Sequence, residues 1–184
     1  MRGRGLIAAA GVLAWASMGG AAPAVSPYAG DERRAIKALS EDEVRDYLAG
    51  SGMGFAKAAE LNRYPGPRHV LELADRLALS TEQRRRTERL FASMRGEAAR
   101  LGGEIVAQER ELDARFASGA ISAAEMERLT ATLGALQGRL RAVHLRAHLA
   151  QRDILTAEQR RQYDVLRGYG QAPPATRRPG HHGH

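Results

Sequence analysis

Residues 68–172 contain no proline, although the chain has seven prolines in all. Proline inside a helix removes a backbone hydrogen bond and clashes with the preceding turn, so this stretch can form long helices. From Met126 onward its apolar residues follow three- and four-residue steps, which is the heptad spacing of helix-on-helix packing. The members of this seam are Met126, Leu129, Leu133, Leu136, Leu140, Val143, Ala147, Ala150 and Ile154.

A first long helix is predicted from about Ser80 to Ser118, and Gly119 supplies its stop. Gly102-Gly103 weakens this helix by about 1 kcal/mol per glycine relative to alanine. Its apolar face recurs every three or four residues, as expected for a half-buried helix: Leu90, Met94, Ala98, Leu101, Ile105, Leu112 and Phe116.

The second long helix begins at Ser122, which with Glu125 forms a capping box. The two helices predict an all-α fold built on a long antiparallel hairpin. One hairpin buries a single seam and needs a second layer. Leu145 and Leu149 lie on the far side of the second helix from its seam. We therefore expect the N-terminal helices and a second protomer to cover them, which makes a homodimeric cradle.

Residues 25–66 are predicted to form short helices joined by glycine-rich turns. Ser40 with Glu43 is a capping box, and the helix that it opens ends at a glycine cluster that begins with Gly50. Pro67 is suited to the first position of the next helix. The helical hairpin domain is then 67–169, and 170–184 is a polar, proline-rich tail expected to be disordered.

The first 24 residues have the pattern of a secretory signal peptide. A basic start is followed by a short apolar run and then by Ala22-Pro23-Ala24. The alternative is an uncleaved membrane anchor, for which the apolar run is short. We expect cleavage near Ala24 and a periplasmic protein. The chain has no cysteine, which excludes disulfides and thiol chemistry.

A five-residue pattern occurs twice, as Leu79-Ser80-Thr81-Glu82-Gln83 and as Leu155-Thr156-Ala157-Glu158-Gln159. Each copy is a leucine, a hydroxyl residue, two variable positions and a glutamine. In each, the hydroxyl residue is a helix N-cap, and the glutamine reaches back from the third helical position. One interpretation is two ordinary helix starts. The repetition at the two ends of a predicted hairpin favours a specific motif.

This combination resembles the LTxxQ superfamily of periplasmic helical proteins, which includes Spy, CpxP, ZraP and the CnrX-type metal sensors. The resemblance runs from about Tyr28 to Tyr169. Residues 52–74 are also similar to a subgroup described as periplasmic heavy-metal sensors or refolding chaperones. The resemblance implies a usually dimeric, cofactor-free protein that binds unfolded clients, binds metals or modulates a membrane sensor. Ser80 replaces threonine in the first copy, and serine caps a helix at least as well.

His144 and His148 lie four residues apart, so they stack on one helix face about 6 Å apart. His144 is expected at the edge of the seam and His148 to be more exposed. Such a pair suits a divalent ion such as zinc, nickel, cobalt or copper, given further ligands. CnrX-type sensors have an H-x-x-x-H pair in the corresponding late helix. For their earlier ligands this chain offers only His69 and Glu72.

The alternative for His144 and His148 is a pair of edge histidines that form hydrogen bonds or face solvent. The tail carries three more histidines, namely His181, His182 and His184. They are interpreted either as a weak, flexible chelator or as incidental polar residues. No cofactor is expected to be obligatory.

The positive charge of the chain comes almost entirely from arginine, with only two lysines, and the formal net charge is +7. Arginine stems lie well on apolar surface while their heads stay charged, which suits capture of unfolded clients. The alternatives are a solvated arginine-rich face and nucleic-acid binding, for which no motif is present. The candidate client-binding residues are Arg84, Arg85, Arg86, Arg160 and Arg161.

No catalytic motif is present, so we do not expect an enzyme. Two functions from different classes remain. The first is an ATP-independent periplasmic chaperone of the Spy and CpxP kind that binds unfolded envelope proteins. The second is a heavy-metal sensor or accessory protein that regulates an inner-membrane signalling partner.

Overall fold

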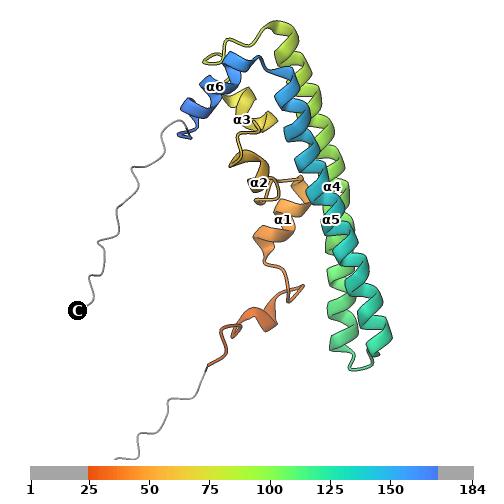
Figure 1. Cartoon of the computed structure of the whole chain (residues 1–184). Helices are drawn as coiled ribbons and strands as arrows, with labels where there is room; N and C mark the ends of the chain where they lie inside the picture. The colour runs from red at the N-terminus through yellow and green to blue at the C-terminus, as the bar shows by residue number, and fades with distance from the viewer. Residues whose placement is uncertain (1–24, 170–184) are drawn as a thin grey trace, which may run out of the picture.

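The computed structural model describes residues 25–169, and this range is helical without β-strands. The two long helices, α4 (Thr81–Ala117) and α5 (Ala123–Ile154), run antiparallel and side by side (Figure 1). The predicted all-α fold and long hairpin are therefore confirmed. The predicted signal peptide and tail lie outside the described residues.

Helix caps explain where the hairpin begins and turns. The Ser80 hydroxyl accepts from the Gln83 amide, and the Gln83 side chain accepts from the Ser80 amide, which completes the expected capping box of α4. Ser122 caps α5 through the Glu125 amide at 3.2 Å. The Glu125 carboxylate does not return to its cap. It lies 3.2 Å from Arg115 across the turn, so only half of the capping box expected there forms.

The core of the hairpin lies between the two apolar faces. The expected seam on α5 is buried from Leu129 to Ala147. The prediction is wrong at Ala150, which is exposed while Gln151 is fully buried in its place, and it is confirmed at the last member, Ile154, which is buried. Gln151 donates to the Thr87 hydroxyl on α4 at 3.2 Å, so this layer of the seam is polar. A pattern of apolar residues alone does not detect such a layer.

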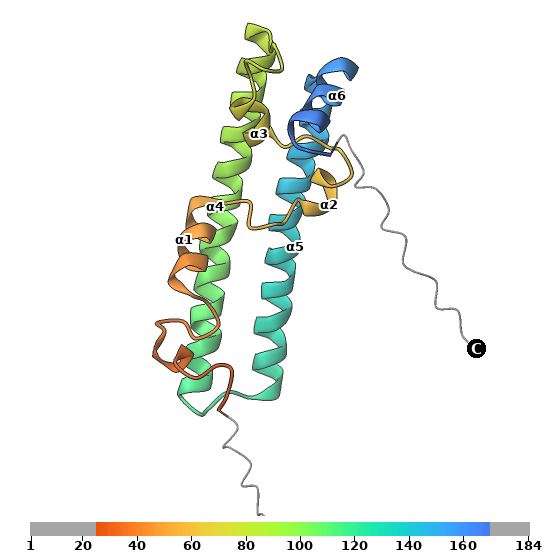
Figure 2. The same ribbon diagram turned by 90° about the vertical axis from the view of Figure 1, so that its left-hand side faces the viewer.

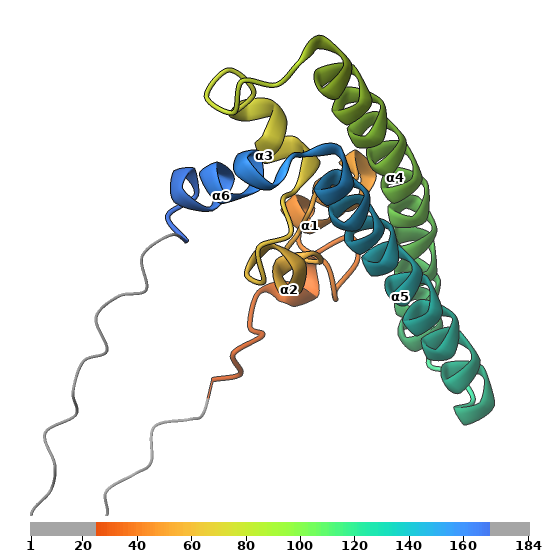
Figure 3. The same ribbon diagram turned by 45° about the horizontal axis from the view of Figure 1, so that its top comes forward.

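Four shorter helices complete the described structure, together with a 3₁₀ turn at Asp31–Arg33. The predicted capping box of Ser40 with Glu43 opens the first of them. Pro67 is the first residue of the third, as expected. The short helices lie on one side of the hairpin (Figure 3). They are α1 (Glu41–Ala49), α2 (Lys57–Glu60), α3 (Pro67–Glu72) and α6 (Ala157–Leu166).

Helix α1 packs directly against α4 (Figure 2). A Cβ atom at Gly102 would sit 2.1 Å from the backbone oxygen of Tyr47. Gly50 ends α1 in a left-handed conformation (φ 65°), and there a Cβ atom would sit 2.4 Å from the Arg95 oxygen. The glycines at positions 50 and 102 therefore let the two helices meet backbone to backbone.

A second core forms where the chain turns from α5 into α6. Val70, Leu77, Leu155 and Tyr163 are buried together there. This core packs α3 and the loop that follows it against α6 and against the turn between α5 and α6. It therefore holds the N-terminal segment in place at this end of the hairpin.

The prediction that the N-terminal helices cover the far side of α5 is wrong at Leu149, which is 55% exposed, whereas Leu145 is half-buried. The expected second protomer therefore stays a prediction, and Leu149 is the residue that tests it. Among residues 25–169, none of the helices is both long enough and apolar enough to span a membrane.

Candidate functional site

The two copies of the repeated motif meet through their glutamines. Gln83 Nε2 donates to Gln159 Oε1 at 2.8 Å, and Gln159 Nε2 donates to Gln83 Oε1 at 3.0 Å. Each Oε1 also accepts from the amide of its own N-cap, Ser80 or Thr156. Two predicted helix starts that are 76 residues apart in the chain thus form one reciprocal pair.

The remaining donor of each glutamine reaches a backbone carbonyl beside the other copy of the motif. Gln83 donates to Ile154 at 3.0 Å, and Gln159 donates to Leu77 at 3.2 Å. The four hydrogen bonds that a side-chain amide can make readily are therefore all present on both residues. This arrangement fastens the start of α6 to the start of α4, so the motif acts as a structural clasp at this end of the hairpin.

Three of the predicted metal ligands face one cavity. His144 and His148 from α5 and His69 from α3 line a cavity of about 480 Å³, together with the apolar side chains of Phe91 and Met94. We call this cavity the histidine hollow. The structure thus brings His69 to the wall of the same cavity as two histidines that lie 75 or more positions later in the sequence.

His148 is held in place from several sides. Its Nδ1 lies 2.8 Å from the carbonyl oxygen of Tyr64 and 3.8 Å from the carboxylate of Glu60. A Cβ atom at Gly66 would sit 2.9 Å from its ring, so this glycine lets the loop close over the histidine. His148 is therefore buried, where the sequence suggested an exposed residue. The covering loop belongs to the N-terminal segment, which helical spacing alone does not place.

His144 is more deeply buried than His148, and its ring stacks on Phe55 with centroids 5.6 Å apart. Its Nε2 is buried and has no hydrogen-bond partner within residues 25–169. Burial, with a smaller contribution from His148, lowers the pKa of His144. Both effects favour the neutral imidazole, which is the form that binds metal ions.

His69 and Glu72 form a pair of their own, with Nδ1 and Oε2 2.7 Å apart. The hydrogen bond from His69 is the largest of the effects that lower the pKa of Glu72. Glu72 thus orients the His69 ring, in the manner of the carboxylates that support metal-binding histidines. Across residues 25–169, no three side chains of histidine, aspartate or glutamate lie close enough together to hold a metal ion. The tail histidines lie outside the described residues.

The predicted client-binding arginines lie at the end of the molecule where α4 and α6 begin. Most of them have partners within the chain. Arg84 lies 2.7 Å from Asp75, and Arg85 lies 2.8 Å from Glu82. Arg160 donates to the backbone oxygens of residues 152 and 155. Arg161 pairs with Glu158, and Arg86 is exposed without an ion-pair partner among the described residues.

A half-buried carboxylate that the sequence did not single out joins the N-terminal segment to α6. Glu60 accepts from the Tyr163 hydroxyl at 2.8 Å, from Arg167 Nε at 3.1 Å and from the Tyr169 hydroxyl at 3.2 Å. Burial and the Glu60 carboxylate raise the pKa of Tyr163. An acidic residue in a four-residue helix gives no sequence signal for such a role, because its partners lie about 100 residues away.

A second feature missed from the sequence is an apolar groove between α1 and α4. It has a volume of about 500 Å³ and is lined by Leu48 and Ala49 of α1 and by Phe91, Ala92, Arg95, Gly96 and Ala99 of α4. We call it the α1–α4 groove. Leu48 is 53% exposed at its edge. Arg95 Nε donates to the Ala49 oxygen at 3.0 Å, which places a cation at the end of α1.

The model of the LTXXQ motif family matches residues 67–167, which is more than half of the chain. The chain belongs to the LTXXQ motif family. The matched range covers both copies of the motif and α3, α4, α5 and α6, and therefore the clasp and all three histidines of the hollow. The α1–α4 groove takes its α1 half from outside this range. No curated protein and no solved structure matched the chain in the other two comparisons.

Proposed function

We propose that this LTXXQ family member is an ATP-independent periplasmic chaperone that holds unfolded clients through exposed apolar surface flanked by arginines. The α1–α4 groove carries the proposal. It offers an open apolar floor with a guanidinium at its side, which suits the mixed apolar and charged segments of an unfolded chain. Family membership supports a periplasmic protein of the Spy and CpxP kind in general, and it does not favour a chaperone over a metal sensor.

Charge supports the same proposal. Without Arg2 and Arg4 of the expected signal peptide the chain keeps a formal net charge of +5, which attracts acidic segments of clients and mainly raises the rate of encounter. Arg86 is a candidate for this first contact, because the structure leaves it exposed. Apolar contact in the groove then holds the client. Moderate salt should therefore slow capture, since exposed charges are screened over about 8–10 Å.

The test is suppression of aggregation of a chemically denatured client without ATP. We compare the unaltered protein with Leu48→Gln and with Leu61→Gln, which lies on the loop after α2. The two leucines are exposed to similar extents, 53% and 58%, so the variants remove similar apolar area. Leu48→Gln should weaken suppression and Leu61→Gln should not. Unchanged client aggregation at a large excess of the unaltered protein would contradict the proposal.

A second function, a metal-responsive sensor or accessory protein with a membrane signalling partner, is favoured by the histidine hollow. Three imidazoles line that cavity, and burial lowers the pKa of His144, which favours its neutral form. The hollow and the α1–α4 groove adjoin, because they share Ala49, Phe91 and Arg95. Titration with nickel, cobalt, copper and zinc ions separates the two functions, since only the second requires tight binding.

We also propose that the protein is a homodimer in which the partner covers Leu149. Light scattering should give about twice the mass of one chain. Leu149→Glu should return the protein to a monomer without loss of helicity, because its side chain is exposed in the single chain. A light-scattering mass of one chain for the unaltered protein at micromolar concentration would contradict the dimer.

A further inference from the structure

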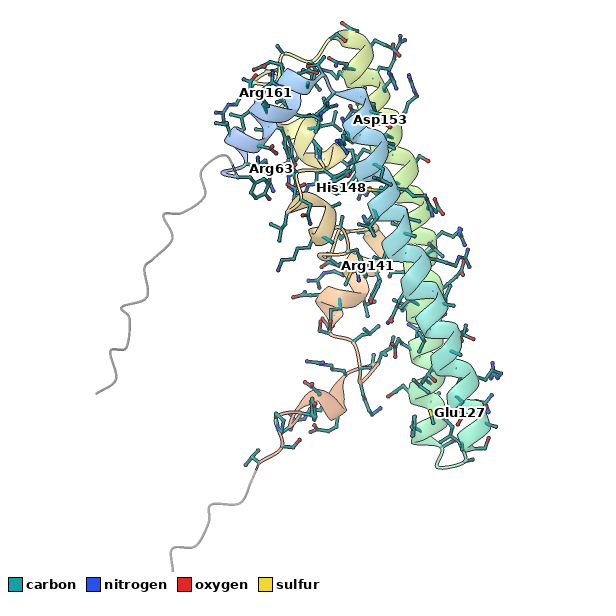
Figure 4. The ribbon with its side chains drawn as sticks, viewed as in Figure 1. Arg63, Glu127, Arg141, His148, Asp153 and Arg161 are labelled. Carbon is teal, nitrogen blue, oxygen red and sulfur yellow. The ribbon has the colours of Figure 1, made fainter. Side chains whose placement is uncertain are left out.

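A different hollow lies at the corner between α5 and α6. It has a volume of about 410 Å³ and is formed by the loop after α2, the end of α5 and α6 as far as Asp164. Figure 4 shows Arg63 and Arg161 beside α6 at this end of the molecule. We call it the arginine hollow, because its charged and aromatic lining consists of Arg63, Arg152, Arg160, Arg161, Tyr64 and Asp164.

The charges around this hollow do not cancel. Arg63 Nη1 lies 3.8 Å from Asp164, and Arg161 pairs with Glu158. The other two guanidiniums have no carboxylate within ion-pair distance in the part of the chain that the structure describes. Two of the four guanidiniums of the lining, those of Arg152 and Arg160, therefore remain without a carboxylate among the described residues.

Neutral groups hold the two remaining guanidiniums in place. Arg152 lies over the ring of Tyr64, with Cζ 4.7 Å from the ring centroid. Arg160 Nη1 donates to the backbone oxygens of Arg152 at 3.1 Å and Leu155 at 3.0 Å. A guanidinium has five N–H donors, so both residues keep donors for a ligand. Because the side chains are already positioned, a ligand loses less free energy in ordering them.

We propose that the arginine hollow binds a multiply charged phosphate of about the size of pyrophosphate, either as a free anion or as the head group of a lipid. Guanidinium forks match phosphate oxygens in pairs. A phosphate group brings a charge of about −1.5 to −2, which suits the excess of cations. A single carboxylate would bring one charge and occupy little of the 410 Å³. The inference goes beyond client binding and does not depend on it.

The test is calorimetry with inorganic pyrophosphate and the full chain, comparing Arg152→Gln with Arg141→Gln. Both residues are exposed on α5, and each variant removes one positive charge. Arg141 is not part of the hollow and has no ion pair among the described residues. We expect one site per chain that Arg152→Gln weakens about tenfold, or about 1.4 kcal/mol, and that Arg141→Gln leaves unchanged.

The source of the phosphate is found with vesicles. Sedimentation with phosphatidylcholine vesicles, with and without added phosphatidate, shows whether a lipid phosphate is bound with the same dependence on Arg152. If the protein binds phosphatidate vesicles and Arg152→Gln weakens that binding, the ligand is a lipid phosphate. If the protein binds pyrophosphate but not the vesicles, the ligand is a free anion. Equal weakening by the two variants, or binding in neither arm, overturns the proposal.

Two controls keep the result clear. Circular dichroism checks that each variant stays folded, and Arg63→Gln, on the loop, replaces Arg152→Gln if the latter unfolds. Suppression of client aggregation should be the same in Arg152→Gln as in the unaltered protein. Loss of phosphate binding with intact suppression therefore separates this site from the chaperone surface.

Discussion

Gln83 and Gln159 exchange two hydrogen bonds, of 2.8 and 3.0 Å, and each also accepts from the N-cap of its own helix. The repeated motif is thus a single structural unit made from two distant segments. Leu155, the leucine of the second copy of the motif, is buried beside this unit in the core with Val70, Leu77 and Tyr163.

The clasp predicts that each glutamine depends on the other. Gln159→Ala removes one partner and leaves donors and acceptors of Gln83 unpaired, so it should lower the free energy of unfolding by about 1–3 kcal/mol. Gln162→Ala, on the same helix, is the control. Gln162 is exposed and makes a single bond to the Arg76 oxygen, so its loss should cost about 0.5 kcal/mol or less.

A double-mutant cycle with Gln83→Ala completes the test. Urea unfolding of the two single variants and the double variant should show a coupling energy well above the error of the measurement. Simple additivity of the two substitutions would mean that the glutamines act only as separate helix caps.

Two adjacent glycines on α4 should respond in opposite directions to the same substitution. Gly102→Ala places a Cβ atom 2.1 Å from the Tyr47 oxygen, so α1 must move and the protein should lose stability. At Gly103 the nearest atom is Leu48 Cδ2 at 4.0 Å, so Gly103→Ala should stabilise by up to about 1 kcal/mol through helix propensity. Thermal unfolding of both variants measures the difference, and a gain of stability in both would contradict the close contact of α1 with α4.

The lowered pKa of His144 predicts a dependence of stability on pH. Burial disfavours the charged imidazole in the folded protein, so the unfolded chain takes up a proton at a higher pH than the folded one. The contribution of neutral His144 to the free energy of unfolding is complete above about pH 6.5. It is lost as the pH falls through the lower pKa that His144 has in the folded protein. Chemical unfolding in the presence of a chelator, between pH 7.5 and about 5, should show this decline.

His144→Leu should flatten that decline, since leucine fills the buried position without a proton to take up. His69→Gln is the control, because His69 is part-exposed and paired with Glu72. A decline that is as steep in His144→Leu as in the unaltered protein would assign the effect to other groups.

If the histidine hollow binds a divalent ion, binding should require the histidines of α5 and should not require the histidines of the tail. In a full chain with His181→Ala, His182→Ala and His184→Ala, calorimetry should show one divalent ion per chain. Binding should disappear when His144→Ala and His148→Ala are added, and should weaken as the pH falls below about 6.5. Circular dichroism should show the helices intact. Absence of binding before the α5 substitutions are added would exclude the hollow as a metal site.

Local signals in the sequence predicted the hairpin well. The cap at Ser80 and the stop at Gly119 place α4 within a residue of its observed ends, because a helix end is decided by a few neighbouring residues. The regular apolar spacing also predicted the buried face of α5 from Leu129 to Ala147 and again at Ile154.

Contacts between distant segments were predicted less well. Gln151 replaces Ala150 in the seam because Thr87, on the other long helix, offers it a partner. Gly102 was interpreted as a weak point of its helix, whereas it is the place where α1 approaches. Phe116 was assigned to the apolar face of α4 but is 57% exposed. Each of these depends on how segments pack, which the spacing within one helix does not contain.

The most direct measurement of the central claim, client capture at the α1–α4 groove, is site-specific crosslinking. The chain has no cysteine, so Leu48→Cys and Leu61→Cys each carry a single thiol for a photoreactive group. The account predicts that a denatured client crosslinks strongly from position 48 and weakly from position 61, and that salt added before mixing reduces the yield. Equal crosslinking from the two positions would contradict it.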